Sequence, residues 1–230
     1  MEKEKLPIVY NRNISKGEKM KKPTKEHKFF ERFLDADTNR LAEYLGYQYQ
    51  RIQSQTLPGI KPLGEGEIWT ESGSLSTVKW REYNVFQFLN PDIHKLYKTI
   101  GEVMREACEY YDLDFEEQEY MVQGWFNINH TKNGKLDWHD HGGPYAPHFH
   151  GYYSVKAEPS VTYYRIFNDP NREVANHNVD NRMIISEMGH PHAQADWDWE
   201  GPRITVAYDI VPLRSLAQAR ASEQHWIPLI

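Results

Sequence analysis

The sequence predicts an α+β fold in which helices come first and a series of short strands follows as a sandwich or jelly roll. Two observations carry this prediction. Apolar residues recur with a period of 3.6 between Ile93 and Tyr111, which is typical of a helix. From Glu119 onward the apolar period changes to two, and loops with Gly, Pro and Asn separate the short runs. Helices followed by strands indicate an α+β domain.

The N-terminal part divides into an arm and a helix. Residues 1–28 are rich in lysine and poor in large apolar residues, so we expect a flexible, solvated arm. The segment from Phe29 to Tyr49 has apolar residues near helical spacing and predicts a helix. Within it, Asp37 or Thr38 can cap a second helical segment.

A loop, a strand and the clearest helix are expected next. Residues 54–77 carry several Pro and Gly residues, and a long stretch of this kind often covers a site. Trp80 to Leu89 alternates loosely and predicts a strand. Asn90 is a good N-cap and Pro91 suits the first helical position, so a helix follows. We interpret its apolar stripe as a packing face.

Short strands then fill the C-terminal half. After the strand that begins near Tyr120, four more are predicted: Tyr152–Lys156, Val161–Phe167, Met183–Ser186 and Arg203–Ile210. In the last of them, Arg203 and Thr205 project to the same side because strand side chains alternate. If this side of the strand faces a barrel interior, Arg203 is a buried cation that needs an anion.

Composition narrows the class of protein. The chain has 230 residues, enough for one large domain, and a net charge of -6, which argues against nucleic acid as a partner. Cys108 is the single cysteine, so neither a disulfide framework nor a cysteine-based zinc ribbon is expected. We find no membrane-length apolar run and no signal peptide, and therefore expect a cytoplasmic protein without a membrane partner.

The histidines are concentrated in one region. Most of the 11 histidines lie between His130 and His192, and three His-x-His pairs occur there, at 139/141, 148/150 and 190/192. On a strand, residues i and i+2 point to the same side, so each pair can bind one metal ion. Neutral imidazole suits iron, zinc, copper and nickel. The cluster therefore predicts a metal site.

The order of these motifs resembles the 2-oxoglutarate- and Fe(II)-dependent oxygenase superfamily, above all an oxygenase group common in phages and marine bacteria. The matching stretches lie between about residues 90 and 211: Trp125–Asn129, His139 with His141, Gly151–Lys156, His192 and Arg203–Tyr208. This resemblance implies a double-stranded β-helix, the jelly-roll relative of cupins, with N-terminal helices packed on it. It also implies one domain over 29–230, with its jelly-roll core at about 119–213.

The same resemblance implies a ligand set. His139, His141 and His192 would be the catalytic metal ligands. Arg203 would pair with the remote carboxylate of 2-oxoglutarate, and Thr205 would add a hydroxyl hydrogen bond. As further residues of the pocket wall and the co-substrate contacts, we expect Asn127 and Tyr153.

One departure from the family pattern concerns the third ligand. The usual triad is two histidines and a carboxylate, but no His-x-Asp or His-x-Glu occurs in this chain. His141 gives a three-histidine site, whereas Asp140 or Asp137 would restore a carboxylate. A position open to chloride, as in halogenating relatives, is a further alternative.

The expected function is that of a 2-oxoglutarate- and Fe(II)-dependent dioxygenase. It would hydroxylate a small molecule or a peptide with O2 and release succinate and CO2. Two alternatives stay open: a three-histidine, cupin-type metalloenzyme that does not use 2-oxoglutarate, and a non-enzymatic jelly-roll binding module. The sequence also leaves a homodimer open.

Overall fold

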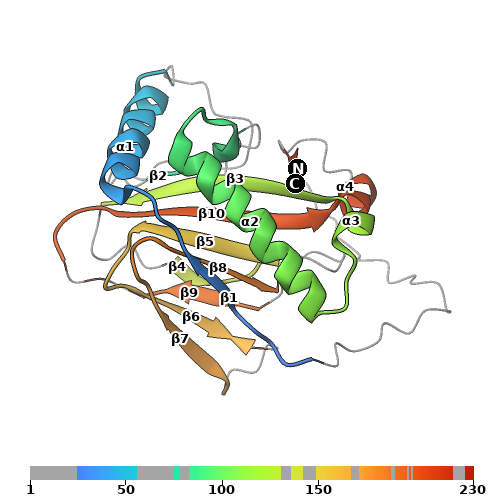
Figure 1. The fold of residues 1–230 in the computed structure, drawn as a ribbon. Helices are drawn as coiled ribbons and strands as arrows, with labels where there is room; N and C mark the ends of the chain where they lie inside the picture. The colour runs from blue at the N-terminus through green and yellow to red at the C-terminus, as the bar shows by residue number, and fades with distance from the viewer. Residues whose placement is uncertain are drawn as a thin grey trace, which may run out of the picture.

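Two antiparallel sheets and a layer of helices make up the protein (Figure 1). The computed structural model describes residues 25–55, 75–77, 83–130, 136–141, 149–166, 171–187, 190–195, 197, 199–219 and 226–230. The larger sheet has the order β1-β8-β5-β10-β3-β11, with β2 paired to β3, and the smaller sheet has the order β4-β9-β6-β7. The two sheets face each other, and the long helices lie on the outer side of the larger one (Figure 1).

The strands have the following bounds. In the larger sheet they are β1 Phe30–Phe33, β2 Leu75–Ser76, β3 Tyr120–Asn129, β5 Phe149–Lys156, β8 Arg182–Glu187, β10 Arg203–Pro212 and β11 Ile227–Pro228. In the smaller sheet they are β4 Leu136–His139, β6 Val161–Arg165, β7 Glu173–His177 and β9 His192–Gln194. From β3 to β10 the chain crosses repeatedly between the sheets, which is the winding of a double-stranded β-helix.

The helices are α1 Thr38–Gln55, η2 Val85–Gln87, α2 Pro91–Tyr110, α3 Phe115–Gln118 and α4 Leu213–Ala219. The predicted α2 is confirmed, and the Asn90 side chain accepts from the backbone N of Asp92 at 2.9 Å and of Ile93 at 3.1 Å. Arg40 of α1 pairs with Asp92 at 2.7 Å and so ties the two helices together. None of the described helices is both long and apolar enough to cross a membrane.

The main core lies between these helices and the larger sheet. The apolar stripe of α2 packs against one face of the sheet, as the helical period predicted. On β10 that face carries Ile204, Val206, Tyr208 and Ile210, all buried. The alternation predicted for β10 is therefore confirmed.

Gly151 of β5 must lack a side chain, because a Cβ there would lie 2.2 Å from the carbonyl oxygen of Ile184.

Two predicted elements are wrong. The helix expected from Phe29 begins only at Thr38, because Phe30–Phe33 pairs as β1 with the edge of β8. Asp37 caps α1, accepting from the backbone N of Arg40 at 3.0 Å. The strand expected to end at Leu89 is instead a turn of 3₁₀ helix within the described residues 83–90. Asn84 holds this turn by accepting from the backbone N of Phe86.

The N-terminal arm is described only at its end. Residues 1–24 lie outside the described residues, but Lys25 pairs with Asp112 at 2.9 Å, and the backbone N of Lys28 donates to the Tyr111 hydroxyl at 3.2 Å. Residues 25–28 therefore contact the C-terminal end of α2.

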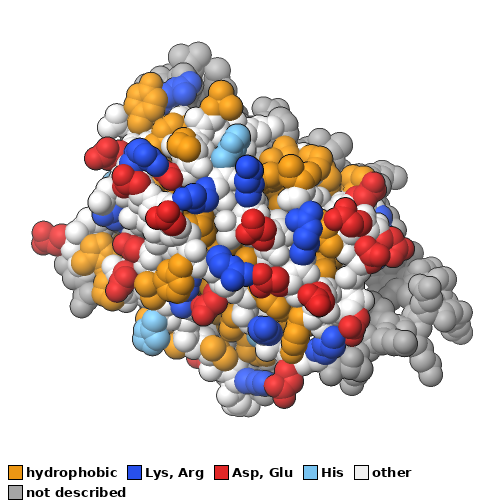
Figure 2. Space-filling view, in the orientation of Figure 1, with side chains coloured by type: hydrophobic (Ala, Val, Ile, Leu, Met, Phe, Trp, Pro, Cys, Tyr) orange, Lys and Arg blue, Asp and Glu red, His pale blue; other side chains and the backbone are white. Residues whose placement is uncertain are grey.

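On the face seen in Figure 2, acidic and basic side chains are interspersed.

Candidate metal centre

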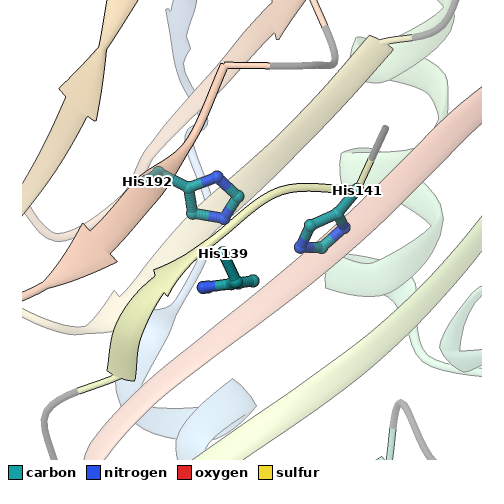
Figure 3. Close-up of side chains that lie close together, drawn as sticks. All are labelled: His139, His141 and His192. Carbon is teal, nitrogen blue, oxygen red and sulfur yellow. The ribbon is translucent and has the colours of Figure 1, made fainter. Parts of the chain in front are cut away.

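Three histidines meet between the two sheets: His139 and His192 from the smaller sheet, and His141 just after β4 (Figure 3). His139 ends β4 and lies opposite His192 of β9 in the strand register, and His141 follows β4 by two residues. Their candidate ligand atoms all lie within 4.8 Å of one another. The ring centroids are 4.3 Å apart for His139 and His192 and 5.0 Å apart for His141 and His192. The structure thus brings together the three predicted ligands.

The ring nitrogens of these histidines are oriented for metal binding. Nδ1 of His139 lies 2.8 Å from the backbone O of Asp137, and Nδ1 of His192 lies 3.4 Å from that of His190. A carbonyl accepts, so each Nδ1 donates and each Nε2 keeps its lone pair. Burial lowers the pKa of both His139 and His192. Both rings are therefore neutral near pH 7, which is the form that binds a metal ion.

Two further groups lie at this site: Asp209, which was not predicted from the sequence as a site residue, and His150, which was named only as a member of the 148/150 pair. One carboxylate oxygen of Asp209 lies 2.9 Å from Nδ1 of His141 and 3.0 Å from Nδ1 of His150. Burial alone would raise the pKa of Asp209, but the two histidines outweigh it and lower this pKa. Asp209 is therefore ionised, and it fixes the ring of His141 with Nε2 turned toward the other ligands.

The two histidines beside Asp209 have opposite charge preferences. Burial lowers the pKa of His141. The charge and hydrogen bond of Asp209 raise this pKa by more than burial lowers it, so the net shift is upward. For His150 burial dominates and lowers the pKa to about 4. The His150 ring lies 4.1 Å from that of His141 and 4.7 Å from that of His192. Four imidazoles thus share this interior.

The carboxylates considered as third ligands lie outside the group. Asp137 and Asp140 are both exposed, and Asp137 contributes its backbone oxygen rather than its carboxylate. Among the described residues, the ligand atoms grouped with His139 and His192 come from His141. The geometry therefore favours the three-histidine alternative.

Arg203 lies on the same face of β10 as Asp209, about 20 Å further along the strand at six residues' separation. Its side chain is buried, and Nε donates to the Ser160 hydroxyl at 3.1 Å. Within the described part of the chain, no carboxylate pairs with it. Burial lowers its pKa to about 10, so Arg203 stays charged at pH 7 and needs an anionic partner that the described residues do not supply.

Tyr164 connects the histidines with Arg203. Its ring stacks on His192 at 5.5 Å, and it lies close enough to Arg203 for the two to interact electrostatically. The Tyr164 hydroxyl and Nε2 of Gln194 are buried without a hydrogen-bond partner among the described residues. Buried polar groups are rarely left in this state, so both fit a polar ligand beside Arg203.

The remaining predicted residues divide between two faces of the sheet. Thr205 shares the face of Arg203, and Nδ2 of Asn127 donates to its hydroxyl at 3.3 Å. Tyr153 instead packs in the helix-side core, where its hydroxyl donates to Asn181 at 2.6 Å. Its prediction as a co-substrate contact is corrected, because Tyr153 lies opposite Val206, which also faces that core. Tyr152, opposite Ala207, lies on the interior face.

These donors fit the groups that the resemblance implies. Neutral imidazoles suit a divalent transition-metal ion such as Fe(II). A buried guanidinium beside an unpartnered hydroxyl and an unpartnered amide suits the carboxylate of a keto acid. Glu and Asp side chains that could neutralise Arg203 are absent from the described part of this interior, which keeps the position for a ligand.

Comparison with known proteins gives fold likenesses alone. No family model matches the chain, and no curated protein matches it in sequence. The non-heme monooxygenase ThoJ, solved as a nickel complex, aligns at a TM-score of 0.55 and 9% identity, covering 88% of this chain and 76% of ThoJ. EvdO2 from Micromonospora carbonacea, solved with 2-oxoglutarate, aligns at 0.51 and 13% identity, covering 81% and 86%.

A third solved structure is the epimerase SnoN in complex with Fe3+, alpha ketoglutarate and nogalamycin RO. It aligns at a TM-score of 0.50 and 10% identity, covering 80% of this chain and 78% of SnoN. Identities this low carry the fold and nothing finer. The chain therefore has the double-stranded β-helix architecture that these proteins share, with helices packed on its larger sheet.

Proposed function

We propose that this chain is an Fe(II)- and 2-oxoglutarate-dependent oxygenase. The observation that carries the proposal is that one jelly-roll interior holds three converging imidazoles and a buried Arg203 with which no carboxylate of the described residues pairs. The fold likeness to EvdO2 and SnoN, both solved with the keto acid, supports it. Bound iron and 2-oxoglutarate would supply O2 activation coupled to decarboxylation, with succinate and CO2 as products.

The chain's own residues would hold and orient these groups. His139, His141 and His192 would bind the ion, and Asp209 would keep the His141 ring in place through Nδ1. At the other end of the pocket, Arg203 would pair with the remote carboxylate of the keto acid. Burial strengthens this charge pairing, because water is excluded from around the guanidinium.

Three side chains would complete the keto-acid pocket. The unpartnered Tyr164 hydroxyl and Gln194 amide are donors that a carboxylate can use. Thr205 adds a third donor on the face of Arg203, where Asn127 already contacts it. Tyr164 also stacks on His192, so one residue would align the metal ligand with the keto-acid pocket.

The substrate is proposed to be a small molecule or a peptide that becomes hydroxylated. The net charge of -6 and the mixed charges on the face in Figure 2 give no extended basic surface there for a polyanion. SnoN, a fold neighbour, has been solved with nogalamycin RO, a small molecule. Incubating the protein with Fe(II), 2-oxoglutarate and a peptide or metabolite library, and scoring a gain of one oxygen atom, tests this assignment.

A second candidate function follows from the missing carboxylate ligand. A three-histidine metalloenzyme that binds metal without 2-oxoglutarate would have the same His139, His141 and His192 centre. It would leave Arg203 without a co-substrate to bind. The two functions therefore differ in whether 2-oxoglutarate stabilises the metal-loaded protein.

The deciding experiment measures 2-oxoglutarate binding and its turnover to succinate in the wild type, Arg203→Gln and Arg105→Gln. Arg105 is an exposed residue of α2 and serves as the matched control. We expect Arg203→Gln to weaken 2-oxoglutarate binding by roughly 100-fold, because truncating one partner of a buried charge pair costs at least about 2 kcal/mol. Metal content should not change. Equal keto-acid binding in all three proteins would contradict the proposal.

A further inference from the structure

A second group of metal-type ligands lies outside the candidate centre. His27 in the N-terminal segment, Glu187 at the end of β8 and His190 before β9 place their candidate ligand atoms within 4.8 Å of one another. The His27 and His190 rings are 4.4 Å apart and nearly perpendicular, at 76°. Two imidazoles and one carboxylate are a donor set that divalent transition metals favour.

The Glu187 carboxylate lies near both imidazoles of this group. Glu187 Oε2 lies 3.7 Å from Nδ1 of His27 and 4.0 Å from Nε2 of His190. Both separations exceed the 2.7–3.2 Å range, roughly, of a hydrogen bond. Around tetrahedral zinc, with bonds of about 2.0–2.1 Å, neighbouring ligand atoms are roughly 3.4 Å apart. The separation from Glu187 to His27 exceeds this value by about 0.3 Å and that to His190 by about 0.6 Å, and all three ligand atoms lie within 4.8 Å of one another.

The surroundings suit a bound cation as well. The His27 and His190 side chains are buried, while the Glu187 side chain is 24% exposed and leaves a path from solvent. Burial alone would raise the pKa of Glu187, but the two imidazoles lower it to about 2. The carboxylate is therefore ionised and faces two nitrogen donors in a partly dry pocket, where a divalent ion gains most from charge neutralisation.

We propose that His27, Glu187 and His190 bind a second divalent transition-metal ion of the zinc type, which fastens the N-terminal segment to the connection between β8 and β9. Glu187 and His190 are three residues apart, whereas His27 lies about 160 residues earlier in the chain, so the ion would cross-link two segments. The fourth position would be filled by water through the exposed side of Glu187. This proposal does not depend on the oxygenase function.

The second group lies behind the wall of the candidate centre. The backbone O of His190 is 3.4 Å from Nδ1 of His192, which is a ligand of the first group. On the other side, the Phe29 ring packs edge-on against both His27, at 4.7 Å, and Tyr164, at 4.8 Å. An ion held by His27 would therefore fix the residues that support His192 and Tyr164.

The test counts metal ions in protein that has been stripped and then titrated with Zn2+ or with Co2+, whose absorption reports tetrahedral coordination. The variants are His27→Gln and Glu187→Gln, with His94→Gln on the exposed side of α2 as the matched control. We expect each of the first two to bind one ion fewer than the wild type and to lose the Co2+ band of that site. The control should match the wild type.

A His139→Gln background separates this proposal from the proposed function. In that background the remaining tight ion should disappear when His27→Gln is added. An unchanged ion count in both His27→Gln and Glu187→Gln would overturn the second site. If His139→Gln binds as many ions as the wild type, the proposed centre at His139, His141 and His192 is contradicted. The ion count of His27→Gln then still tests the second site. Thermal unfolding of the metal-free variants, compared with the metal-free wild type, shows that the fold is intact.

Discussion

The two faces of β10 differ in chemistry although they belong to the same strand. One face carries Ile204, Val206, Tyr208 and Ile210 into the core beneath α2. The opposite face carries Arg203, Thr205 and Asp209 into the interior between the sheets. On the first face the side chains pack in an apolar core, and the Tyr208 hydroxyl donates to the backbone O of Ile184. On the second face the Arg203 guanidinium is buried, and no carboxylate of the described residues pairs with it. Along β10, one set of alternate residues thus packs in the core, and the other set faces the candidate binding site.

This difference shows where the protein gives up stability for binding. A buried cation without an anion is costly, and so is a buried polar atom such as the Tyr164 hydroxyl, which has no hydrogen-bond partner among the described residues. Natural sequences keep such costs mainly at functional sites. Substitutions on the two faces should therefore fall into two classes, one that changes ligand binding and one that changes the free energy of unfolding.

The largest effect is expected on the histidine side. His139→Ala should weaken Fe(II) binding by more than about 100-fold, because loss of even an outer-shell partner costs roughly 10–100-fold. The unfolding free energy of the metal-free protein should change by less than about 1 kcal/mol. Isothermal titration with an Fe(II) surrogate and chemical denaturation measure the two quantities. The control is His177→Ala, at an exposed position. Equal metal affinity in both variants would contradict the assignment of His139 as a metal ligand.

On the core side, Ile210→Ala should lower the free energy of unfolding by about 2–5 kcal/mol, because it empties a fully buried position. Metal affinity of the folded protein should stay within about twofold, since Ile210 faces away from the histidines. Urea denaturation gives the first quantity and a metal titration the second. A large change in metal affinity with little destabilisation would contradict the division between the faces.

Gly151→Ala is expected to destabilise by about 1–3 kcal/mol, because its Cβ would meet the backbone O of Ile184 and the ring of Tyr208. Gly46→Ala in α1 is the matched control. A Cβ there meets nothing within 4 Å, and alanine is the better helix former, so this change should stabilise by about 0.5–1 kcal/mol. Thermal melts that shift both variants in the same direction would contradict this prediction.

The smallest effect concerns Cys108 in the helix-side core. Burial raises the pKa of its thiol to about 11, so at pH 8 the thiol is neutral in the folded protein and the reactive thiolate is scarce. Raising the pH toward 9 should make Cys108 only slightly more reactive while the protein stays folded, because pH 9 is still below the pKa of this thiol in the folded protein. A thiol-reagent assay with and without denaturant checks this. Fast labelling of the native protein would contradict it.

Local patterns in the sequence determined one part of this protein. The α2 stripe with its Asn90 cap and the alternation along β10 follow from spacing alone, and they need only a helical period of 3.6 or a strand period of two. Such signals act over a few residues and survive without knowledge of the fold. The resemblance to a known family, and not spacing, singled out His139, His141 and His192 as one ligand set.

Tertiary contacts decided the rest. Phe30–Phe33 became a strand because β8 offers an edge to pair with, which overrides its helical spacing. Asp209 lies opposite His150 through the pairing of β10 with β5 and also reaches His141, while one residue of register places Tyr153 on the other face. His27 meets Glu187 and His190 across most of the chain. No local period encodes such meetings, because they depend on which strands pair and which loops close.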